Sequence, residues 1–264
     1  MSTPPSSNRG WLRRVRALRD RTTREREGVL YVEGIRQVLA AYEGGQTLDA
    51  VLVDPSRMRS TFGWELIDRI QHTDVSIVML SPSEFDSISS RDNPIGLAAL
   101  VRWRSRRLRE AQVGRADVWL LADDIRDPGN LGTLVRTVDA LGAAGLVSHR
   151  GVDAGHPTVA RASLGTLFRT RVHHAASLDE LFAWAAGNQL PVVATSTRAE
   201  TDIAALEASR PLAVLVGNEG EGLETETIAR CDFAARIPMH GSASSLNVSV
   251  AAGIALYELM RAGR

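Results

Sequence analysis

The chain of 264 residues carries 31 basic and 31 acidic side chains, so its formal net charge is zero. Apolar residues make up 44% of the chain, as in ordinary globular proteins, and no apolar run approaches the ~20 residues that cross a bilayer. The N-terminal segment has arginines but no apolar stretch behind them, so we expect neither a signal peptide nor an anchor there. A single cysteine, Cys231, excludes an internal disulfide and a cysteine-based zinc site, and it favours a reducing, cytoplasmic setting.

All 31 basic residues are arginine, and two segments are especially rich in them. Residues 1–30 contain eight arginines against three acidic side chains, and residues 102–115 contain six against Glu110 alone. A neutral protein with two such segments can still present a basic face to nucleic acid, because guanidinium groups suit phosphate contacts. Solvated helix faces and a codon bias toward arginine explain the pattern too, so both interpretations stay open.

The first half of the chain alternates strands and helices. Residues 1–9 are small, polar and proline-containing and are expected to be disordered, whereas residues 11–27 have apolar side chains at helical spacing. Such alternation predicts a compact α/β domain over 28–104, followed by a polar, basic linker over 105–116. Within that domain, strands are predicted at 29–34, 50–54, 75–80 and 96–103, and helices at 35–45, 63–71 and 81–89.

Residues 117–264 form the second predicted domain. Strands are predicted at 118–123, 145–149, 192–196, 212–217 and 233–238, and helices at 130–145, 177–187, 223–230 and 246–262. The strands are almost continuously apolar, which indicates a parallel sheet that is covered on both faces. Ligands of such sheets bind at the carboxyl ends of the strands, so the loops that follow these strands are the places to seek a site.

Two polar segments in this domain follow apolar strands and precede helices. In the first, at 123–137, Asn130 is predicted to cap a helix that carries Arg136. Alone, this segment also fits a capped surface helix with a solvated arginine. The second, at 212–223, has three glycines around Glu219, which allow backbone N–H groups to approach a ligand. It is neither a P-loop nor a dinucleotide fingerprint, so alone it is a weak signal.

The third segment, at 236–259, places small polar residues directly before an apolar helix. Ser245, Asn247 and Ser249 surround the predicted helix start. One such residue would suffice to cap the helix, so the cluster indicates an additional role.

Together the three segments resemble the motifs of the SpoU/TrmH family, within the SPOUT class of RNA methyltransferases. The patterns are D-x-x-x-D-P-x-N-x-G-x-x-x-R at 123–136, G-x-E-G-x-G-L at 217–223 within the segment 214–223, and I-P-M-x-G-x-x-x-S-L-N-V-S-x-A at 237–251. The third is highly specific, and all three agree in order and spacing. In the first half, REGVLYVEGIRQVLAA and RDNPIGLAALV look like the family's small RNA-binding domain, which is related to a ribosomal-protein fold.

The resemblance implies an α/β fold: a C-terminal parallel-sheet SPOUT domain with a deep trefoil knot, plus a small N-terminal α/β RNA-binding domain. General rules of chain topology would not predict the knot. The resemblance also implies a homodimer with the site near the subunit interface, a cytoplasmic location, and ribosomal RNA as the substrate. The implied cofactor is S-adenosyl-L-methionine, bound bent in the knot by backbone groups around Thr195, Gly217, Ile237, Met239 and Leu246.

The expected reaction is methyl transfer to a ribose 2′-hydroxyl, which requires alignment of the two reactants and departure of the hydroxyl proton. The resemblance assigns the active-site positions to Arg136, Asn130, Glu219, Ser245 and Asn247. A guanidinium group has a pKa above ~12, so we expect Arg136 to grip a phosphate and favour oxyanion character rather than act as a base. Ser245 and Asn247 are expected to orient the ribose and cofactor, and Asn130 to fix Arg136 or the neighbouring loop.

No metal is expected, because the adjacent His173 and His174 would face opposite sides of a strand, and Cys231 is expected to be inert. Transfer RNA is the alternative substrate. A non-catalytic RNA-binding protein on the same fold is a second alternative, although the intact third motif argues against it. A nucleotide-dependent oxidoreductase shares the α/β alternation but would need a fingerprint loop that this chain lacks.

Overall fold

The computed structural model describes residue 5 and residues 7–262, and their packing divides the chain into two compact units. The N-terminal unit runs to Arg104 and also includes Gly155–Arg169, and it takes in helical residues before 28 that lay outside the domain predicted over 28–104. The C-terminal unit comprises Ser105–Ala154 and the described residues from Thr170 onward. The second domain predicted over 117–264 is therefore interrupted by a segment that packs with the first.

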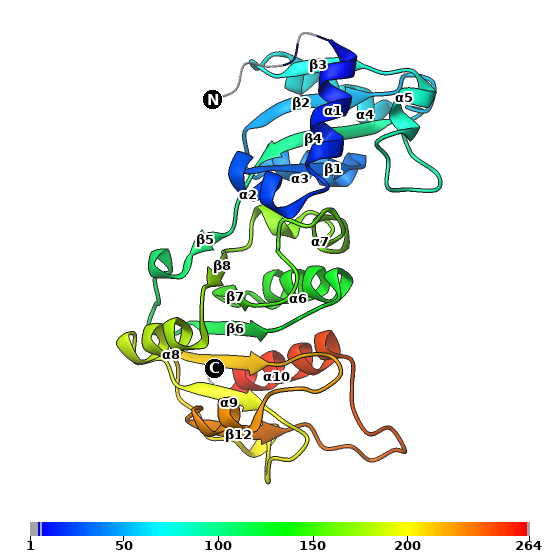
Figure 1. Ribbon diagram of the computed structural model, residues 1–264. Coiled ribbons are helices and arrows are strands. Elements are labelled where there is room, and N and C mark those ends of the chain that lie inside the picture. The colour runs from blue at the N-terminus through cyan, green and yellow to red at the C-terminus, as the bar shows by residue number, and fades with distance from the viewer. Residues whose placement is uncertain (1–4, 6, 263–264) are drawn as a thin grey trace. The chain divides into compact units, whose positions relative to one another are not determined.

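The N-terminal unit contains a four-stranded sheet in the order β1-β4-β2-β3 (Figure 1). Strand β4 is antiparallel to β1 and β2, and β2 is parallel to β3. The α/β alternation predicted for this region is confirmed. Its elements are α1 (Asn8–Ala17), α2 (Arg21–Glu27), β1 (Val29–Glu33), α3 (Ile35–Glu43), β2 (Leu48–Val53), α4 (Thr61–Gln71), β3 (Ser76–Met79), α5 (Pro82–Asp86), β4 (Leu97–Arg102), α7 (Pro157–Ala162) and the 3₁₀ turn η2 (Thr166–Phe168).

Helix α1 packs on this sheet through one apolar face. Its buried side chains pack in one core with residues of strands β1, β2, β3 and β4. Phe85 in α5 and Ile88 after it belong to the same core. The helix contributes Trp11, Leu12 and Val15, and Leu18 follows directly after it. The helix begins at Asn8, where the Ser7 side chain accepts a hydrogen bond from the Gly10 amide. The expected disorder of residues 1–9 is therefore wrong for Asn8 and Arg9, while residues 1–4 and 6 lie outside the described part.

The C-terminal unit contains an eight-stranded sheet in the order β10-β12-β9-β11-β6-β7-β8-β5, and every neighbouring pair is parallel. The predicted parallel sheet is confirmed. Its elements are β5 (Arg106–Arg107), η1 (Leu108–Glu110), β6 (Val118–Asp123), α6 (Pro128–Leu141), β7 (Gly145–His149), β8 (Val172–Ala175), α8 (Leu178–Gly187), β9 (Val192–Thr195), β10 (Thr201–Asp202), η3 (Ile203–Ala205), β11 (Leu212–Val216), α9 (Thr225–Ala229), β12 (Phe233–Arg236) and α10 (Val248–Ala262).

The segment predicted as a linker over 105–116 is partly built into this unit. Strand β5 pairs with β8 at the edge of the sheet, and Leu108 is completely buried in the core cluster that also includes residues of α8. The polar, basic composition of the segment concealed this role, because its few apolar side chains, Leu108 and Ala111 among them, are enough to join the segment to the core.

Helices cover both faces of the parallel sheet. Helices α6 and α10 pack against each other, and α10 also contacts β6 and β11 (Figure 1). The core cluster that contains Leu108 joins the strands of this sheet to η1, α8 and the residues around α9. In the described part of the chain, no helix is long and apolar enough to span a membrane.

Two loops at the carboxyl edge of the sheet are bound to each other. The amide of Asp124 donates to the carbonyl of His149 at 2.9 Å, and the amide of Val152 donates to the carbonyl of Ile125 at 2.9 Å. Between them lies Gly151, whose φ of +69° favours glycine. A Cβ on Gly151 would lie 2.2 Å from the Ile125 carbonyl oxygen, so only glycine allows the loops to approach this closely.

We expect Gly151→Ala to lower the free energy of unfolding by about 2–4 kcal/mol, since it adds a backbone clash to the cost of a left-handed alanine. Gly142→Ala is the matched control, because Gly142 has a similar φ of +70° and open space around it. The control should cost only about 1–2 kcal/mol. Urea denaturation measures both values, and equal losses would contradict the close-approach argument.

Candidate functional site

The first motif forms the start of helix α6. Asp127 caps the helix, since its side chain accepts a hydrogen bond from the Asn130 amide at 2.8 Å, and Pro128 occupies the first turn. The prediction that Asn130 is the cap was therefore wrong by three residues. As a result, Asn130 lies inside the first turn, and its side chain is free to bind other parts of the chain.

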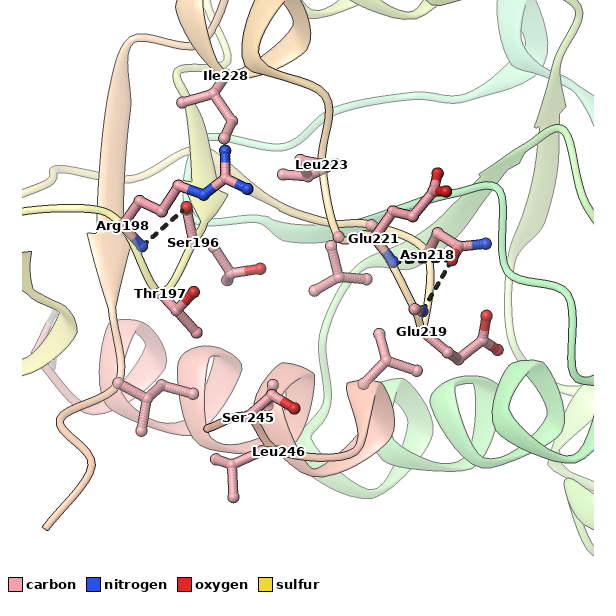
Figure 2. A pocket seen from close by; sticks show the side chains of 18 of the residues that line it. Ser196, Thr197, Arg198, Asn218, Glu219, Glu221, Leu223, Ile228, Ser245 and Leu246 are labelled. Carbon is pink, nitrogen blue, oxygen red and sulfur yellow. Dashed lines mark hydrogen bonds between the residues drawn. The ribbon is translucent and has the colours of Figure 1, made fainter. Parts of the chain in front are cut away.

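The second motif is a compact loop between β11 and α9, folded around Asn218. The Asn218 side-chain oxygen accepts hydrogen bonds from the amides of Gly220 at 2.8 Å and Glu221 at 3.2 Å (Figure 2). Its side-chain nitrogen donates to the Asp124 carbonyl at 3.1 Å, which ties the loop to the first motif. Asn218 was not among the predicted site residues, although an asparagine among glycines is a known sign of a side chain that organises a turn.

Glu219 connects the glycine loop to α6. Its carboxylate accepts hydrogen bonds from the Asn130 side chain at 2.9 Å and from the amides of Arg126 and Asp127, both at 3.1 Å. Partial burial raises the pKa of Glu219, but hydrogen bonds from the Asn130 side chain and from backbone N–H groups outweigh it, so the pKa lies below its usual 4.5. Glu219 is therefore an ionised group that accepts hydrogen bonds at neutral pH.

The third motif is bound to the same asparagine. The Asn247 side chain donates to the Asn130 side-chain oxygen at 3.0 Å, and the Ser249 hydroxyl donates to the Asn130 carbonyl at 3.2 Å. Asn247 also caps α10, because its oxygen accepts the Ser249 amide at 2.9 Å. Asn130 is thus the middle of a chain of hydrogen bonds from Asn247 to Glu219, and this chain joins three segments that are far apart in the sequence.

The second and third of these segments, together with the loop after β9, line a cavity of about 200 Å³ (Figure 2). The glycine loop forms one wall, the loop after β9 forms the opposite wall, and Ser245 and Leu246 lie between them. All five residues predicted to bind the cofactor line this cavity: Thr195, Gly217, Ile237, Met239 and Leu246. Walls that combine apolar side chains with polar side chains and backbone groups suit a flat adenine ring, a ribose and a charged amino-acid tail, so the residues present fit S-adenosylmethionine.

Two sequence families match this chain. A model described as the SpoU rRNA Methylase family matches residues 117–257, which is more than half of the chain. The chain belongs to the SpoU rRNA methylase family. A second model, described as an MRM3-like substrate binding domain, matches residues 11–99 of the same chain.

Full-length relatives of this SpoU protein include named ribosomal RNA enzymes. The 23S rRNA (uridine(2479)-2'-O)-methyltransferase of Streptomyces viridochromogenes is 32% identical over 251 residues, covering 92% of this chain and 86% of the relative. The 23S rRNA (guanosine-2'-O-)-methyltransferase RlmB of Coxiella burnetii is 30% identical over 220 residues, covering 79% and 84%. The crystal structure of the SpoU methyltransferase AviRb from Streptomyces viridochromogenes, in complex with AdoMet, matches with a TM-score of 0.87 at 29% identity, covering 96% and 99%.

The other predicted site residues of this SpoU protein lie in three positions. Glu219 and Ser245 line the cavity, while Asn130 and Asn247 support its rim through hydrogen bonds. Arg136 does neither: it is exposed on α6, does not line the cavity and makes no hydrogen bond or ion pair with any described residue. The expectation that Asn130 fixes the neighbouring loop agrees with its contact to Glu219, whereas its contact to Arg136 is not found.

Two charged residues that the sequence analysis missed also line the cavity of this SpoU protein. Arg198 lies on the loop after β9, and Glu221 lies on the glycine loop (Figure 2). Their position directly after apolar parallel strands was the available signal, since that is where ligands of such sheets bind.

Beneath the glycine loop, a buried carboxylate holds the ends of two strands. Asp123 at the end of β6 lies 2.8 Å from His149 Nδ1 and 3.0 Å from the guanidinium of Arg150. Arg150 also contacts Glu224 at 3.4 Å, at the start of α9. Asp123 is only 3% exposed, so these partners compensate a buried charge, and through Arg150 the network links the end of β6 to the start of α9.

Neither His173 nor Cys231 contributes to the cavity. His173 is buried, with Nδ1 3.1 Å from the Arg107 carbonyl, and burial lowers its pKa. Burial also raises the pKa of the Cys231 thiol to about 12, so the thiolate is scarce at neutral pH. Within residues 7–262, no group of three or more histidine, cysteine, aspartate or glutamate side chains is arranged to hold a metal ion.

We expect Glu219→Gln to lower the free energy of unfolding by about 1 kcal/mol at pH 7, because an amide presents an N–H₂ group to donors that need an acceptor. The folded pKa of Glu219 lies below the unfolded value, so its stabilisation is complete above pH ~4.5 and is lost as the pH falls through the folded pKa. The difference between wild type and variant should therefore shrink below pH ~4.5.

Glu221→Gln is the control, since it changes the same charge on the same loop at a carboxylate that accepts no hydrogen bond from the described residues. Urea denaturation between pH 3 and 7 measures both variants. A pH-independent effect at Glu219, or an equal effect at Glu221, would show that the three donors do not need the carboxylate.

Proposed function

We propose that this protein transfers a methyl group from S-adenosylmethionine to a ribose 2′-hydroxyl of ribosomal RNA. The observation that carries the proposal is a cavity lined by the second and third motif segments, whose rim the first motif supports through the hydrogen bonds of Asn130. Membership of the SpoU rRNA methylase family supports the chemistry. The location that follows from this substrate is the cytoplasm.

Ribosomal RNA is favoured over transfer RNA as the substrate. Two relatives that cover 92% and 79% of this chain are named for 23S ribosomal RNA, and three others that cover 88–92% are named tRNA/rRNA methyltransferases, so none of them is named for transfer RNA alone. The match to a substrate binding domain over residues 11–99 gives the chain a separate unit that can hold RNA. A protein that only binds RNA would not need the cavity that the motif residues line, so the cavity argues against a non-catalytic role.

In this proposal the cofactor supplies a methyl group on a positively charged sulfur, which makes that carbon electrophilic. Backbone groups around Gly217, Ile237 and Leu246 hold the cofactor, and Thr195 and Met239 complete the walls. Ser245 and Asn247 lie at the side of the cavity where the third motif meets α6, and they orient the ribose. Glu219 positions the glycine loop rather than accepting a proton, because its lowered pKa makes it a weak base.

Arg136 binds the RNA rather than the cofactor. Its guanidinium is exposed and has no partner among the described residues, so it is available to a phosphate. A permanent positive charge beside the ribose also favours the negative charge that develops on the 2′-oxygen during transfer. Arg136 cannot serve as the base, because guanidinium does not lose its proton in proteins.

The trefoil knot is part of the proposal. Between β11 and α10 the chain runs out to β12, on the far side of β9, and then returns to pack α10 against β11 and β6. Residues on both the outgoing and the returning segment line the cavity, as expected if the cofactor binds against a knotted loop.

We further propose that the protein acts as a homodimer through α10. Val250, Ile254 and Tyr257 are 49%, 36% and 56% exposed, and their spacing places them on one helix face. A row of large exposed apolar side chains is typical of an interaction surface. Since α10 packs against α6, a second copy seated there would lie close to the helix that carries Arg136.

The methylation proposal is tested with purified protein, S-adenosylmethionine labelled in the methyl group, and an unmethylated 23S ribosomal RNA transcript. We expect a 2′-O-methyl nucleoside after nuclease digestion. Arg136→Ala should lower kcat/KM for RNA by 100-fold or more, or about 3 kcal/mol, while the affinity for S-adenosylhomocysteine stays unchanged.

Arg115→Ala is the control for Arg136, since Arg115 is also exposed but precedes β6, at the opposite edge of the sheet. It should keep wild-type rates. Wild-type protein that transfers no label to the transcript, or to total ribosomal RNA from cells lacking the enzyme, would refute the activity. Normal rates in Arg136→Ala would refute only the role of that residue.

The dimer is tested with Ile254→Glu/Tyr257→Glu, which places two charges on the exposed face of α10. Burying an unpaired carboxylate is strongly unfavourable, so the variant should elute as a monomer while wild type elutes as a dimer. Light scattering after gel filtration measures the mass. Phe62→Glu, at an exposed aromatic side chain of the N-terminal unit, should leave the mass unchanged. A monomeric wild type would contradict the proposal.

A further inference from the structure

Several arginines near the start of the N-terminal unit are engaged with acidic partners. Arg14 binds Glu27 at 3.0 Å and Asp49 at 2.6 Å, and Arg21 binds Glu25 at 2.7 Å. The remaining acidic residue of this region, Asp20, caps α2 through the Thr23 amide. All three acidic side chains between residues 7 and 30 are therefore committed to other groups.

Three arginines on α1 have no such partner. Arg9 and Arg13 form no ion pair or hydrogen bond with any residue in the described part of the chain, and Arg16 contacts only the neutral Ser87 hydroxyl, at 2.7 Å. All three side chains are exposed. We call Arg9, Arg13 and Arg16 the arginine stripe.

The stripe occupies one face of the helix. Its members are spaced by four and three residues, which places them above one another along α1. The opposite face, with Trp11, is buried against the sheet, so the stripe lies on the outer side of the unit (Figure 1). Together with Ser7 and Gly10, the three arginines line a shallow depression of about 450 Å³.

This arrangement weakens the helix in which it lies. Like charges at a spacing of four residues repel each other, and Arg9 lies in the first turn, where the helix dipole disfavours a positive charge. The first turn of α1 has no acidic residue to offset this effect. No contact inside the described protein compensates the repulsion, so the stripe is explained better by an external anion than by folding.

We propose that the arginine stripe binds the phosphate backbone of the substrate RNA. The identification of the anion as RNA rests on the proposed function. A row of guanidinium forks matches successive phosphates, and no aromatic side chain among the residues lining the depression offers a platform for stacking bases. The stripe therefore supplies affinity and register, and it leaves the choice of nucleotide to other parts of the protein.

The test compares two triple variants that lose the same charge from the same unit. Arg9→Gln/Arg13→Gln/Arg16→Gln removes the stripe. Arg21→Gln/Arg69→Gln/Arg169→Gln removes three exposed arginines that are each paired with a glutamate. Filter binding to an unmethylated 23S ribosomal RNA transcript, between 50 and 300 mM salt, gives Kd and its salt dependence.

We expect the stripe variant to bind RNA at least tenfold more weakly near ~150 mM salt, with the slope of log Kd against log salt reduced by about two, since each lost phosphate contact removes ~0.7–0.9. The control triple should change the slope by less than about 0.5. Affinity for S-adenosylhomocysteine should be unchanged in both variants. Equal losses in the two triples, or an unchanged slope in the stripe variant, would overturn the proposal.

A purely structural role is separated by the double variant Arg9→Gln/Arg13→Gln, which keeps the Arg16 contact to Ser87. Its thermal midpoint should equal or exceed that of wild type, because repulsion is removed, while its salt slope still falls by about 1.4–1.8. A lowered midpoint with an unchanged slope would mean that the stripe serves folding or another partner. Binding by wild type without methyl transfer would refute the proposed activity and leave the stripe's role in binding RNA intact.

Discussion

Asn130 lies in the first turn of α6. Its side-chain nitrogen donates a hydrogen bond to Glu219, and its side-chain oxygen accepts one from Asn247. A primary amide is suited to this position because it donates and accepts at the same time. A carboxylate here would repel Glu219, and a hydroxyl could not reach both neighbours. The three motif segments are therefore held at a common rim by one side chain, and the cavity beneath them depends on it.

Charge is distributed around this cavity in two layers. The lower layer contains the buried carboxylate of Asp123. Its charge is compensated by Arg150, and its contacts with His149 and Arg150 join the ends of β6 and β7. The upper layer is solvated and adaptable: it includes Glu219, which is held by backbone amides, and Arg198, which lines the opposite wall. A rigid base below a polar rim can keep its shape while a charged cofactor and an RNA strand are exchanged.

The sequence predicts this fold well where local pattern decides it. Apolar runs located the strands of the parallel sheet, because strands buried on both faces cannot tolerate polar side chains. The sequence does not predict the fold where contacts between residues far apart in the chain determine the packing. Nothing in the local pattern of residues 155–169 shows that they pack with the N-terminal unit, and nothing in a basic segment shows that Leu108 anchors an edge strand.

The candidate site shows the same division. The family resemblance identified seven cavity-lining positions, yet the sequence could not distinguish Asp127 from Asn130 as the helix cap, since both are good capping residues. Nor could it reveal that Asn218 reaches back to Asp124, because this contact spans 94 residues. Local propensity indicates which residues are able to bind a ligand, whereas only the folded chain shows which of them meet.

The return of Gly155–Arg169 to the N-terminal unit has a consequence for biosynthesis. Helix α7 in this segment packs against β1, near the beginning of the chain. During translation the N-terminal unit therefore stays incomplete until β6, α6 and β7 have also left the ribosome. Domains generally fold in the order in which they emerge, but here the first one waits for a piece encoded within the second. Until α7 has been synthesised, the face of β1 that α7 covers in the folded protein lacks this cover.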